Sequence, residues 1–366
     1  MTLLRLIKKL SRQLLLVVNI VAAALMLATG YSGYFNPDTF PLLSVSGLLF
    51  PFIALFNILL VLLSVAVRRR YALIPLLALL ACYGPIRSYV PLNFSREAPD
   101  GALTVLSYNV YMYAGWDYKR TGNNPIVNYI ARSGADIVCL QESTTKEYDS
   151  LLIDRVLDPV YEYRDTMMKK PHGGEQLTIY SHYPILSRER IAYESQGNMS
   201  MASELLVNGD TVLVINNHLE TNGLTPDEKK KFQHIVHGQK EEGAELAILG
   251  KLKESAKKRG RQAVVVADYI QRYKELHPQR SIIACGDFND SPLSWAHHTV
   301  ARQLQDCYVA AGNGPGWSYE RHTIHVRIDH IMCSKDYDVY ECKVDKQISA
   351  SDHYPVLCKI KKRAKP

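Results

Sequence analysis

The sequence lacks charge in two long stretches. No charged residue or histidine lies between Arg12 and Asp38, and none lies between Asp38 and Arg68. A helix needs roughly 20 apolar residues to cross a bilayer, so each stretch is long enough. A third apolar stretch, Tyr71 to Ile86, reaches that length only if its flanking residues sit at the interface. Residues 1–94 are therefore expected to form a membrane segment with two to three transmembrane helices. A cleaved signal peptide is disfavoured because its apolar core would be shorter.

Paired cysteine motifs are also absent. None of the seven cysteines forms a CxxC pair, so a structural zinc site is not expected. Cys139 and Cys285 lie in strand-like apolar runs and are expected to be buried thiols. Cys342 and Cys358 lie on separate strand-like runs and could pair in an oxidising compartment, which the sequence does not decide.

Neither repeats nor low-complexity tracts interrupt the chain. We expect a linker at 95–101 and one domain at 102–366.

Excess positive charge accompanies the apolar stretches. The formal net charge is +7, and basic residues cluster near both chain ends and at Arg68 to Arg70. The clusters around the first two spans predict that both outer ends of this pair are cytoplasmic. If the third stretch crosses, as we expect, the domain lies on the non-cytoplasmic side of the inner (cytoplasmic) membrane of a multi-pass protein. If that stretch only lies in the interface, the domain stays inside. The basic C-terminus is interpreted as a solvated tail rather than a nucleic-acid patch.

The remaining chain has the pattern of a mixed α/β domain. The Asn208-Gly209 pair between two apolar runs predicts a hairpin. Thr225-Pro226-Asp227-Glu228 predicts a capped helix start, after which apolar residues continue at helical spacing. Gly260 is expected to break that helix before a second one runs from Ala263 to Leu276. Strands are expected at Leu103–Val110, Asp136–Gln141, Leu177–Ser181, Glu204–Val207, Thr211–Asn216, Ser281–Cys285, Ile328–Cys333 and Pro355–Ile360.

Acidic, amide and imidazole side chains recur at the ends of these apolar runs. Such groups contribute little to packing and must be solvated, paired or bound to a metal. One of them would be explained by a turn, but five on separate strands are not. The recurring residues are Asn109, Glu142, His218, Asp287 with Asn289, Asp329 with His330, and Asp352 with His353.

These residue types suit the hydrolysis of a phosphate ester. That reaction needs a cation to offset charge on the phosphate oxygens, and carboxylate and amide oxygens suit Mg²⁺, with Mn²⁺ as the alternative. It also needs a base for water and a group that stabilises the leaving oxygen. Histidine titrates near neutrality and suits both roles. A carboxylate usually orients such a base, and here Asp329 would orient His353.

Six short motifs follow one another along the chain in this order: SYN, LQE, NxHL, GDFN, RIDH and SDH. In this order they resemble the endonuclease/exonuclease/phosphatase superfamily, which includes deoxyribonuclease I, abasic-site endonucleases, bacterial sphingomyelinases and inositol polyphosphate 5-phosphatases. The resemblance covers residues 102–361, and the chain is similar to a membrane-anchored, bacterial-type member. It implies a four-layered α/β sandwich, two packed sheets with helices outside, following the N-terminal transmembrane segment.

The resemblance also implies roles for individual residues. Glu142 would be the main metal ligand, supported by Asn109 and Asp352, and Asn109 would also contact the phosphate. His353 would act as the base or bind phosphate, and His218 would stabilise the phosphate or protonate the leaving group. The remaining roles belong to Asp287 and Asn289, which would position the water and the scissile phosphate, and to Asp329, which would orient His353.

The sequence leaves the substrate open. Tyr111 stands where abasic-site endonucleases usually carry an acid, which argues against that subgroup, and no family-matched acid partners His218. A phosphodiesterase on nucleic acid or phospholipid headgroups is favoured. A phosphomonoesterase on inositol phosphates and a non-catalytic membrane-tethered binding module are the alternatives. The expected partners are the lipid bilayer and the phosphate ester, with no protein partner inferred.

Overall fold

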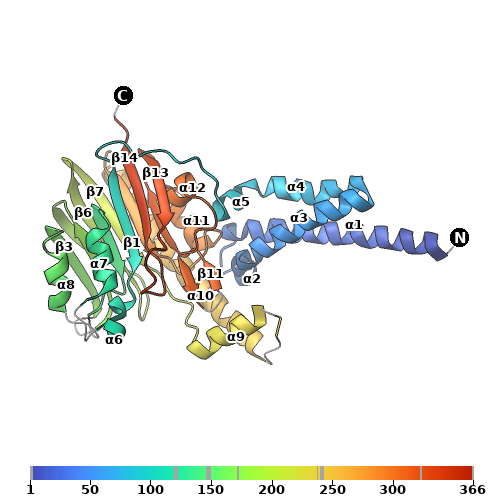
Figure 1. Cartoon of the computed structure of the whole chain (residues 1–366), viewed down its shortest axis with the longest axis horizontal. Coiled ribbons are helices and arrows are strands. Elements are labelled where there is room, and N and C mark those ends of the chain that lie inside the picture. Colours follow the sequence, from blue (N-terminus) through green and yellow to red (C-terminus); the bar gives the residue numbers. More distant parts are fainter. Residues whose placement is uncertain are drawn as a thin grey trace.

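Two six-stranded sheets form the centre of the larger part of the molecule (Figure 1). The computed structural model describes residues 3–118, 123–145, 150–170, 173–236, 238–239, 243–321 and 324–364. The first sheet has the order β13-β14-β1-β2-β4-β3, and the second has the order β5-β6-β7-β8-β12-β9. The strands are β1 (Leu103–Asn109), β2 (Ile137–Gln141), β3 (Tyr163–Lys170), β4 (Gly173–Ser181), β5 (Ile185–Ile191), β6 (Met199–Val207), β7 (Asp210–His218), β8 (Ser281–Asp287), β9 (Gln305–Asp306), β10 (Tyr319–Arg321), β11 (Ile324–Val326), β12 (Asp329–Cys333), β13 (Tyr337–Val344) and β14 (Val356–Lys362).

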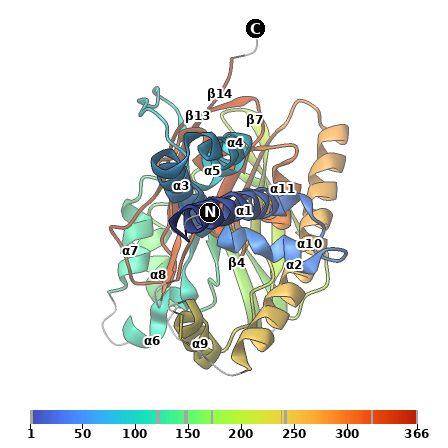
Figure 2. The same ribbon diagram turned by 90° about the vertical axis from the view of Figure 1, so that its right-hand side faces the viewer.

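Alternation of side chains along each strand explains the layers. Successive residues of a strand point to opposite faces, so Val105 of β1 packs between the sheets and Leu106 packs outward. Helices α7 (Pro125–Arg132) and α8 (Ser150–Leu157) cover the outer face of the first sheet. Helices α10 (Ala244–Leu276) and α11 (Trp295–Ala301) cover the second (Figure 2). The expected four-layered α/β sandwich is thereby confirmed.

Two short sequence motifs correctly predicted a hairpin and the start of a helix. Asn208 and Gly209 both adopt positive φ in the hairpin between β6 and β7, as expected. Thr225 and Glu228 exchange bonds between backbone N–H and side-chain oxygen at the start of α9 (Pro226–Val236). The eight expected strands are all present with shifted ends, and β13 contains the strand-like run around Cys342, whereas β3, β5 and the short β9, β10 and β11 were not expected.

The helix break expected at Gly260 is wrong. Helix α10 runs without interruption from Ala244 to Leu276. The glycine answers a packing need, because a Cβ atom there would lie 2.6 Å from Cγ of Pro37 and 3.2 Å from Cδ1 of Trp295. The helical stretch is instead divided earlier, between α9 and α10. Gly243, just before α10, has a φ of 75°, which lies outside the right-handed helical region.

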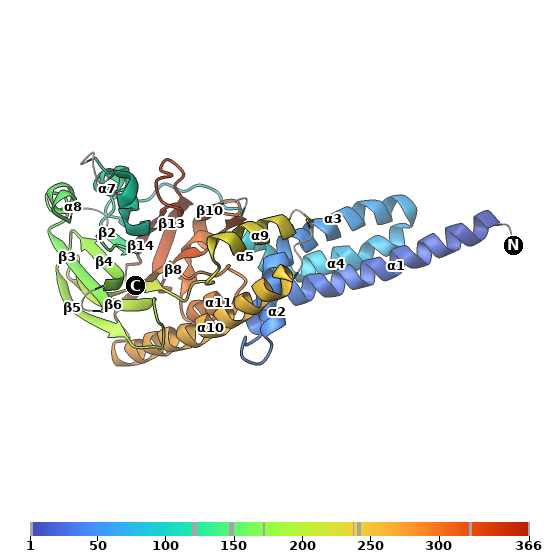
Figure 3. The same cartoon turned by 90° about the horizontal axis from the view of Figure 1, so that it is seen from below.

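The N-terminal helical segment (residues 3–89) projects from the sandwich as a narrow bundle (Figure 3). Two of its stretches, Leu6–Gly30 and Pro41–Val67, are long and apolar enough to cross a membrane, and a third pair, Arg69–Ala81 and Tyr83–Tyr89, is bent by 58°. The helical elements are α1 (Leu3–Gly30), η1 (Ser32–Tyr34), α2 (Pro41–Val45), η2 (Ser46–Leu49), α3 (Phe50–Val67), η3 (Arg69–Ala72), α4 (Leu73–Ala81) and α5 (Tyr83–Tyr89). In the sandwich, the short elements are η4 (Tyr111–Ala114), α6 (Gly115–Tyr118) and α12 (Cys307–Ala311).

Buried amides hold the bundle together. Asn19 Nδ2 on α1 donates to Ser64 Oγ on α3 at 2.9 Å. Asn57 Nδ2 on α3 donates to the Ala22 carbonyl at 3.2 Å. Polar bonds between otherwise apolar helices fix which faces meet, because leaving these groups unpaired there is costly.

The bundle is fastened to the sandwich. Ser32 Oγ donates to the Leu293 carbonyl at 2.8 Å, and Arg261 Nη2 lies 2.7 Å from Asp38 Oδ1. The buried guanidinium of Arg327 donates to carbonyl oxygens at the end of α5, those of Ser88 and Tyr89. These contacts place η1, the turn that holds Asp38 and the end of α5 against the sandwich.

All seven cysteines are buried as free thiols. Cys139 and Cys285 lie in the core between the sheets, as expected. Cys342 and Cys358 are direct cross-strand neighbours on β13 and β14.

Candidate active site

The polar strand ends meet at one edge of the sandwich. Asn109, His218 and Asp287 end their strands, and Glu142 follows β2 directly. Asp329 instead begins β12, opposite Asp287, and Asp352 and His353 precede β14. The expectation that all of them follow strands is therefore wrong for these three. They reach the same edge because β12 and β14 run antiparallel to β8 and β1.

His353 forms a tight pair with Asp329. Its Nδ1 lies 2.8 Å from Asp329 Oδ2, and both side chains are buried. A carboxylate accepts, so Nδ1 carries the proton and Nε2 is left facing Asp287 Oδ2 at 3.7 Å. Burial alone would lower the pKa of His353, but the charges of Asp329 and Asp287 raise it well above its usual value.

His218 forms an ion pair, without the geometry of a hydrogen bond, with a carboxylate that the sequence did not reveal. Its Nδ1 lies 3.1 Å from Oε2 of Glu175 on β4, and their side chains are 5% and 7% exposed. Its Nε2 lies 3.6 Å from Asp287 Oδ2 and 4.0 Å from Glu142 Oε1. Burial opposes protonation, but Glu175, Asp287 and Glu142 together raise the pKa of His218 to about 10. This imidazole therefore carries a positive charge at neutral pH.

Negative charge is crowded around these two histidines. Asn109 Nδ2 donates to Glu142 Oε1 at 3.2 Å and to Asp287 Oδ2 at 3.1 Å. Burial raises the pKa of Glu142, and Glu175 and Asp352 raise it further. Burial is also the main cause that raises the pKa of Asp287. In this site the ionised form of the carboxyl groups is unfavourable. A bound cation would stabilise that form by offsetting its negative charge.

The donor set fits a hard divalent cation. Glu142 is 28% exposed on its side chain, so it offers carboxylate oxygens to the cavity, and Asp352 lies at the same rim. Asp287, Asp329 and His353 also offer donor atoms within 4.8 Å of one another. The hydrogen bond between His353 and Asp329 already occupies two of those atoms, which leaves the Glu142 side of the site as the better position.

Backbone conformation fixes the position of two site residues. Glu142 and Asn289 both have a φ of 51°, in the left-handed region that most residues avoid. Asn289 is held there because its N–H donates to Asp287 Oδ1 at 2.7 Å and its Nδ2 donates to the Leu219 carbonyl at 3.0 Å. Gly286, just before Asp287, has a φ of 129°, and a Cβ atom there would lie 1.9 Å from the Asn217 carbonyl oxygen.

Other residues considered from the sequence lie elsewhere or serve the fold. His330 is buried away from the cavity, with Nε2 3.0 Å from the Asp290 carbonyl. Asn216 joins the sheets, because its Nδ2 donates to the Leu140 carbonyl and its Oδ1 accepts from Gln141. Tyr180 and Ser181 are buried in β4. His172 and His322 lie outside the described residues.

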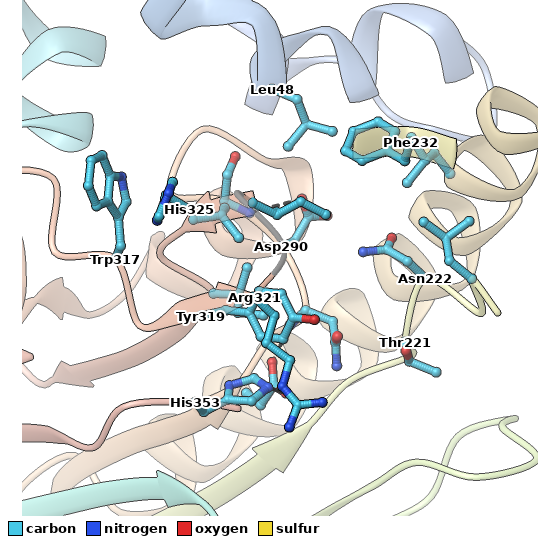
Figure 4. A pocket seen from close by; sticks show the side chains of 18 of the residues that line it. Leu48, Thr221, Asn222, Phe232, Asp290, Trp317, Tyr319, Arg321, His325 and His353 are labelled. Carbon is cyan, nitrogen blue, oxygen red and sulfur yellow. Dashed lines mark hydrogen bonds and ion pairs between the residues drawn. The ribbon is translucent and has the colours of Figure 1, made fainter. Parts of the chain in front are cut away.

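A cavity of about 860 Å³ contains this constellation (Figure 4). Six of the site residues line it: Glu142, His218, Asp287, Asn289, Asp352 and His353. Tyr111, Lys229, Tyr319 and Arg321 extend its wall and were not identified from the sequence. Lys229 Nζ bonds to the Tyr319 hydroxyl at 3.3 Å, and the Arg321 guanidinium lies 5.1 Å from the Tyr111 ring centroid.

A known protein family matches most of the sandwich. The model of the Endonuclease/Exonuclease/phosphatase family matches residues 106–353. The chain belongs to this family. Residues 12–89 match a domain of unknown function, DUF8431. No curated protein matches the chain in sequence. The family match supports hydrolysis of phosphate esters in general.

Solved structures share the fold. Truncated TDP2 of Caenorhabditis elegans superposes with a TM-score of 0.51 at 16% identity, covering 72% of this chain and 99% of that one. The human nocturnin catalytic domain with bound sulfate anion gives 0.51 at 16% identity, covering 73% and 97%. At this identity the likeness establishes the fold, and the activity must be argued from the site.

Proposed function

We propose that this protein is a membrane-tethered, metal-dependent hydrolase of phosphate esters, acting on a phosphodiester. The observation that carries the proposal is the pairing of two buried histidines with carboxylates, His353 with Asp329 and His218 with Glu175, on either side of Asp287. Structural histidines do not require this arrangement, whereas acid–base chemistry at one phosphate does.

The proposed metal site consists of Glu142 with Asp352 and Asn109, and the cation is Mg²⁺, with Mn²⁺ as the alternative. When bound, the metal offsets negative charge on the phosphate oxygens. The positive charge of the metal would also offset the negative charge of the carboxylates that raise the histidine pKa values. This favours a neutral His353.

The chain's own residues then carry the proton transfers. In its neutral form, His353 accepts a proton at Nε2 from the attacking water, while Asp329 holds the proton on Nδ1. Asp287 and Asn289 position the water and the scissile phosphate. Charged His218, held by Glu175, presents Nε2–H to a phosphate oxygen or to the leaving oxygen.

The placement of basic residues supports the proposed topology. Lys8, Lys9, Arg12 and Arg68 lie together at the end of the bundle remote from the sandwich. By the positive-inside rule that end is cytoplasmic, so the site faces the other side if the bent pair α4–α5 serves as a third span.

The full-length protein in detergent tests the proposed activity. We expect Mg²⁺-dependent turnover of bis(4-nitrophenyl) phosphate, which chelation abolishes and added Mg²⁺ restores. Glu142→Gln should lower kcat/KM by about 100-fold or more, because a ligand to the cation is lost. Glu97→Gln, an exposed carboxylate in the linker, is the matched control and should behave as wild type. Metal-independent turnover, or a fully active Glu142→Gln, would refute the proposal.

A further inference from the structure

The site cavity reaches well beyond the catalytic groups. At one end it is lined by Glu142, His218 and Asp287. At the other it is lined by residues of η2 and the start of α3, which belong to the N-terminal helical segment, including Leu48 and Phe52. Figure 4 shows Leu48 and Phe232 close together at that end, with His353 at the opposite end. One continuous space therefore joins the phosphate chemistry to the helical segment.

The end next to the helical segment is apolar and opens on an apolar surface. Phe52 is 62% exposed and Leu48 is 39% exposed although both line the cavity. The exposed face of α3 continues from there through Leu55 and Leu59. In water such a surface would be costly, but it is the surface expected of a helix in a bilayer. The cavity mouth consequently lies where the helical segment would emerge from the membrane.

The middle of the cavity combines positive charge with aromatic rings. Arg321 is exposed above the Tyr111 ring, and Lys229 lies against Tyr319. Figure 4 shows two of them, Tyr319 and Arg321, between Leu48 at one end of the cavity and His353 at the other. Their charge is complementary to an anionic phosphate that enters with its apolar part behind it.

We propose that the substrate is a membrane lipid phosphate ester, whose phosphate reaches Glu142 and His353 while its hydrocarbon chain lies against Leu48, Phe52 and Phe232. The N-terminal helical segment is then part of the substrate site as well as an anchor. This inference rests on the hydrolytic function proposed above and names its substrate class.

The reaction is a balanced hydrolysis. The oxygen of water bonds to phosphorus, and the bond from phosphorus to the leaving oxygen breaks. One proton of the water passes to His353, and the leaving oxygen gains one proton from His218 or solvent. The lipid backbone and the headgroup separate on either side of the broken bond.

A nucleic-acid substrate fits the cavity less well. Binding several phosphates of a strand needs a groove that carries a row of basic side chains. Among the described residues, the wall beside the helical segment includes Leu48, Phe52 and Phe232. A single phosphate attached to an apolar body matches this order of surfaces.

The test compares substrates with and without hydrocarbon chains, using the full-length protein in mixed micelles. Phosphatidylglycerol and glycerophosphoglycerol form the diester arm, and phosphatidic acid and glycerol phosphate form the monoester arm. In at least one arm, we expect kcat/KM to be at least about tenfold higher for the lipid than for its chain-free analogue. Leu48→Gln with Phe232→Gln should reduce this preference about tenfold, mainly through KM. Leu42→Gln with Leu246→Gln, exposed leucines off the cavity, should retain it.

Three results would overturn the lipid assignment while the hydrolase survives. They are equal turnover of lipids and chain-free analogues, equal effects of the two double variants, and a higher kcat/KM on single-stranded DNA than on either lipid. Failure of every substrate would instead refute the hydrolytic function.

Cross-linking tests the lipid position without turnover. Phosphatidylglycerol with a photoactivatable group in its acyl chain should cross-link to the cavity wall around Leu48 and Phe232 in Glu142→Gln. Labelling confined to the outer faces of α1 and α3 would refute the assignment.

Discussion

His218 shows how one side chain can be set in a charged state by its neighbours. Its pKa of about 10 reflects three carboxylates that outweigh the burial that opposes protonation. Because the folded pKa is raised, protonated His218 stabilises the fold fully below its ordinary pKa. This contribution is lost as pH rises toward 10. The same charge makes Nε2–H a strong donor toward a phosphate oxygen.

Glu175→Gln should lower this pKa while preserving the shape of the site. The substitution removes the nearest negative charge, so we expect the His218 titration midpoint to fall by about one unit or more. Imidazole NMR signals of the metal-free protein measure the midpoint directly. The alkaline limb of the pH–kcat profile should move in the same direction. Glu97→Gln is the control, and a midpoint that is equal in both variants would show that Glu175 does not set the charge.

At this scale the sequence predicted the residues that carry a strand-end or motif signal and missed Glu175, which carries neither. Asn109, Glu142, His218 and Asp287 each end an apolar run, and they meet because their strands end at one edge. Glu175 carries no such signal, since it stands near the beginning of β4. It reaches the site only because β4 runs antiparallel to β2, which is a property of the sheet rather than of the local sequence.

Among the elements, α10 illustrates how packing overrides local preference. Its two interior glycines have the same helical backbone but different surroundings. A Cβ atom at Gly250 would meet nothing within 4 Å, whereas one at Gly260 would meet Pro37 and Trp295. The sequence pattern could not distinguish a helix-breaking glycine from one needed for contact, because the contacting residue lies more than 200 positions away. Strands β3 and β5 were missed for another reason, because their largely exposed residues give weak apolar patterns.

These two glycines provide a matched pair of substitutions. Gly250→Ala should stabilise the protein by about 0.5–1 kcal/mol, because alanine is the better helix former. Gly260→Ala gains the same propensity but crowds Pro37, so we expect a net loss of about 1–2 kcal/mol. Thermal unfolding of the full-length protein in one detergent measures both as opposite shifts in Tm. Equal stabilisation by the two variants would show that the contact between α10 and the Pro37 loop yields easily.

In the whole molecule, the candidate site lies beside the N-terminal helical segment. Family membership could be predicted from six short motifs, and so could the layered fold, because both depend on patterns within the soluble part of the chain. The sequence could not predict that η2 and α3 line the site cavity, because that contact joins two segments through tertiary packing alone. If the bundle crosses a membrane, as we propose, its orientation decides which pool of phosphate esters the site can reach.

Cysteine labelling in intact cells tests that orientation. All seven natural cysteines are buried, so a membrane-impermeant maleimide should report mainly on an added one. Asp100→Cys, exposed beside the sandwich, should label in intact cells, whereas Lys9→Cys, at the basic end of the bundle, should label only after lysis. The opposite pattern would place the site in the cytoplasm. Labelling of both positions only after lysis would also do so, and would mean that α4 and α5 do not cross as a third span. In either case the lipid phosphates within reach of the site would be those of the inner leaflet.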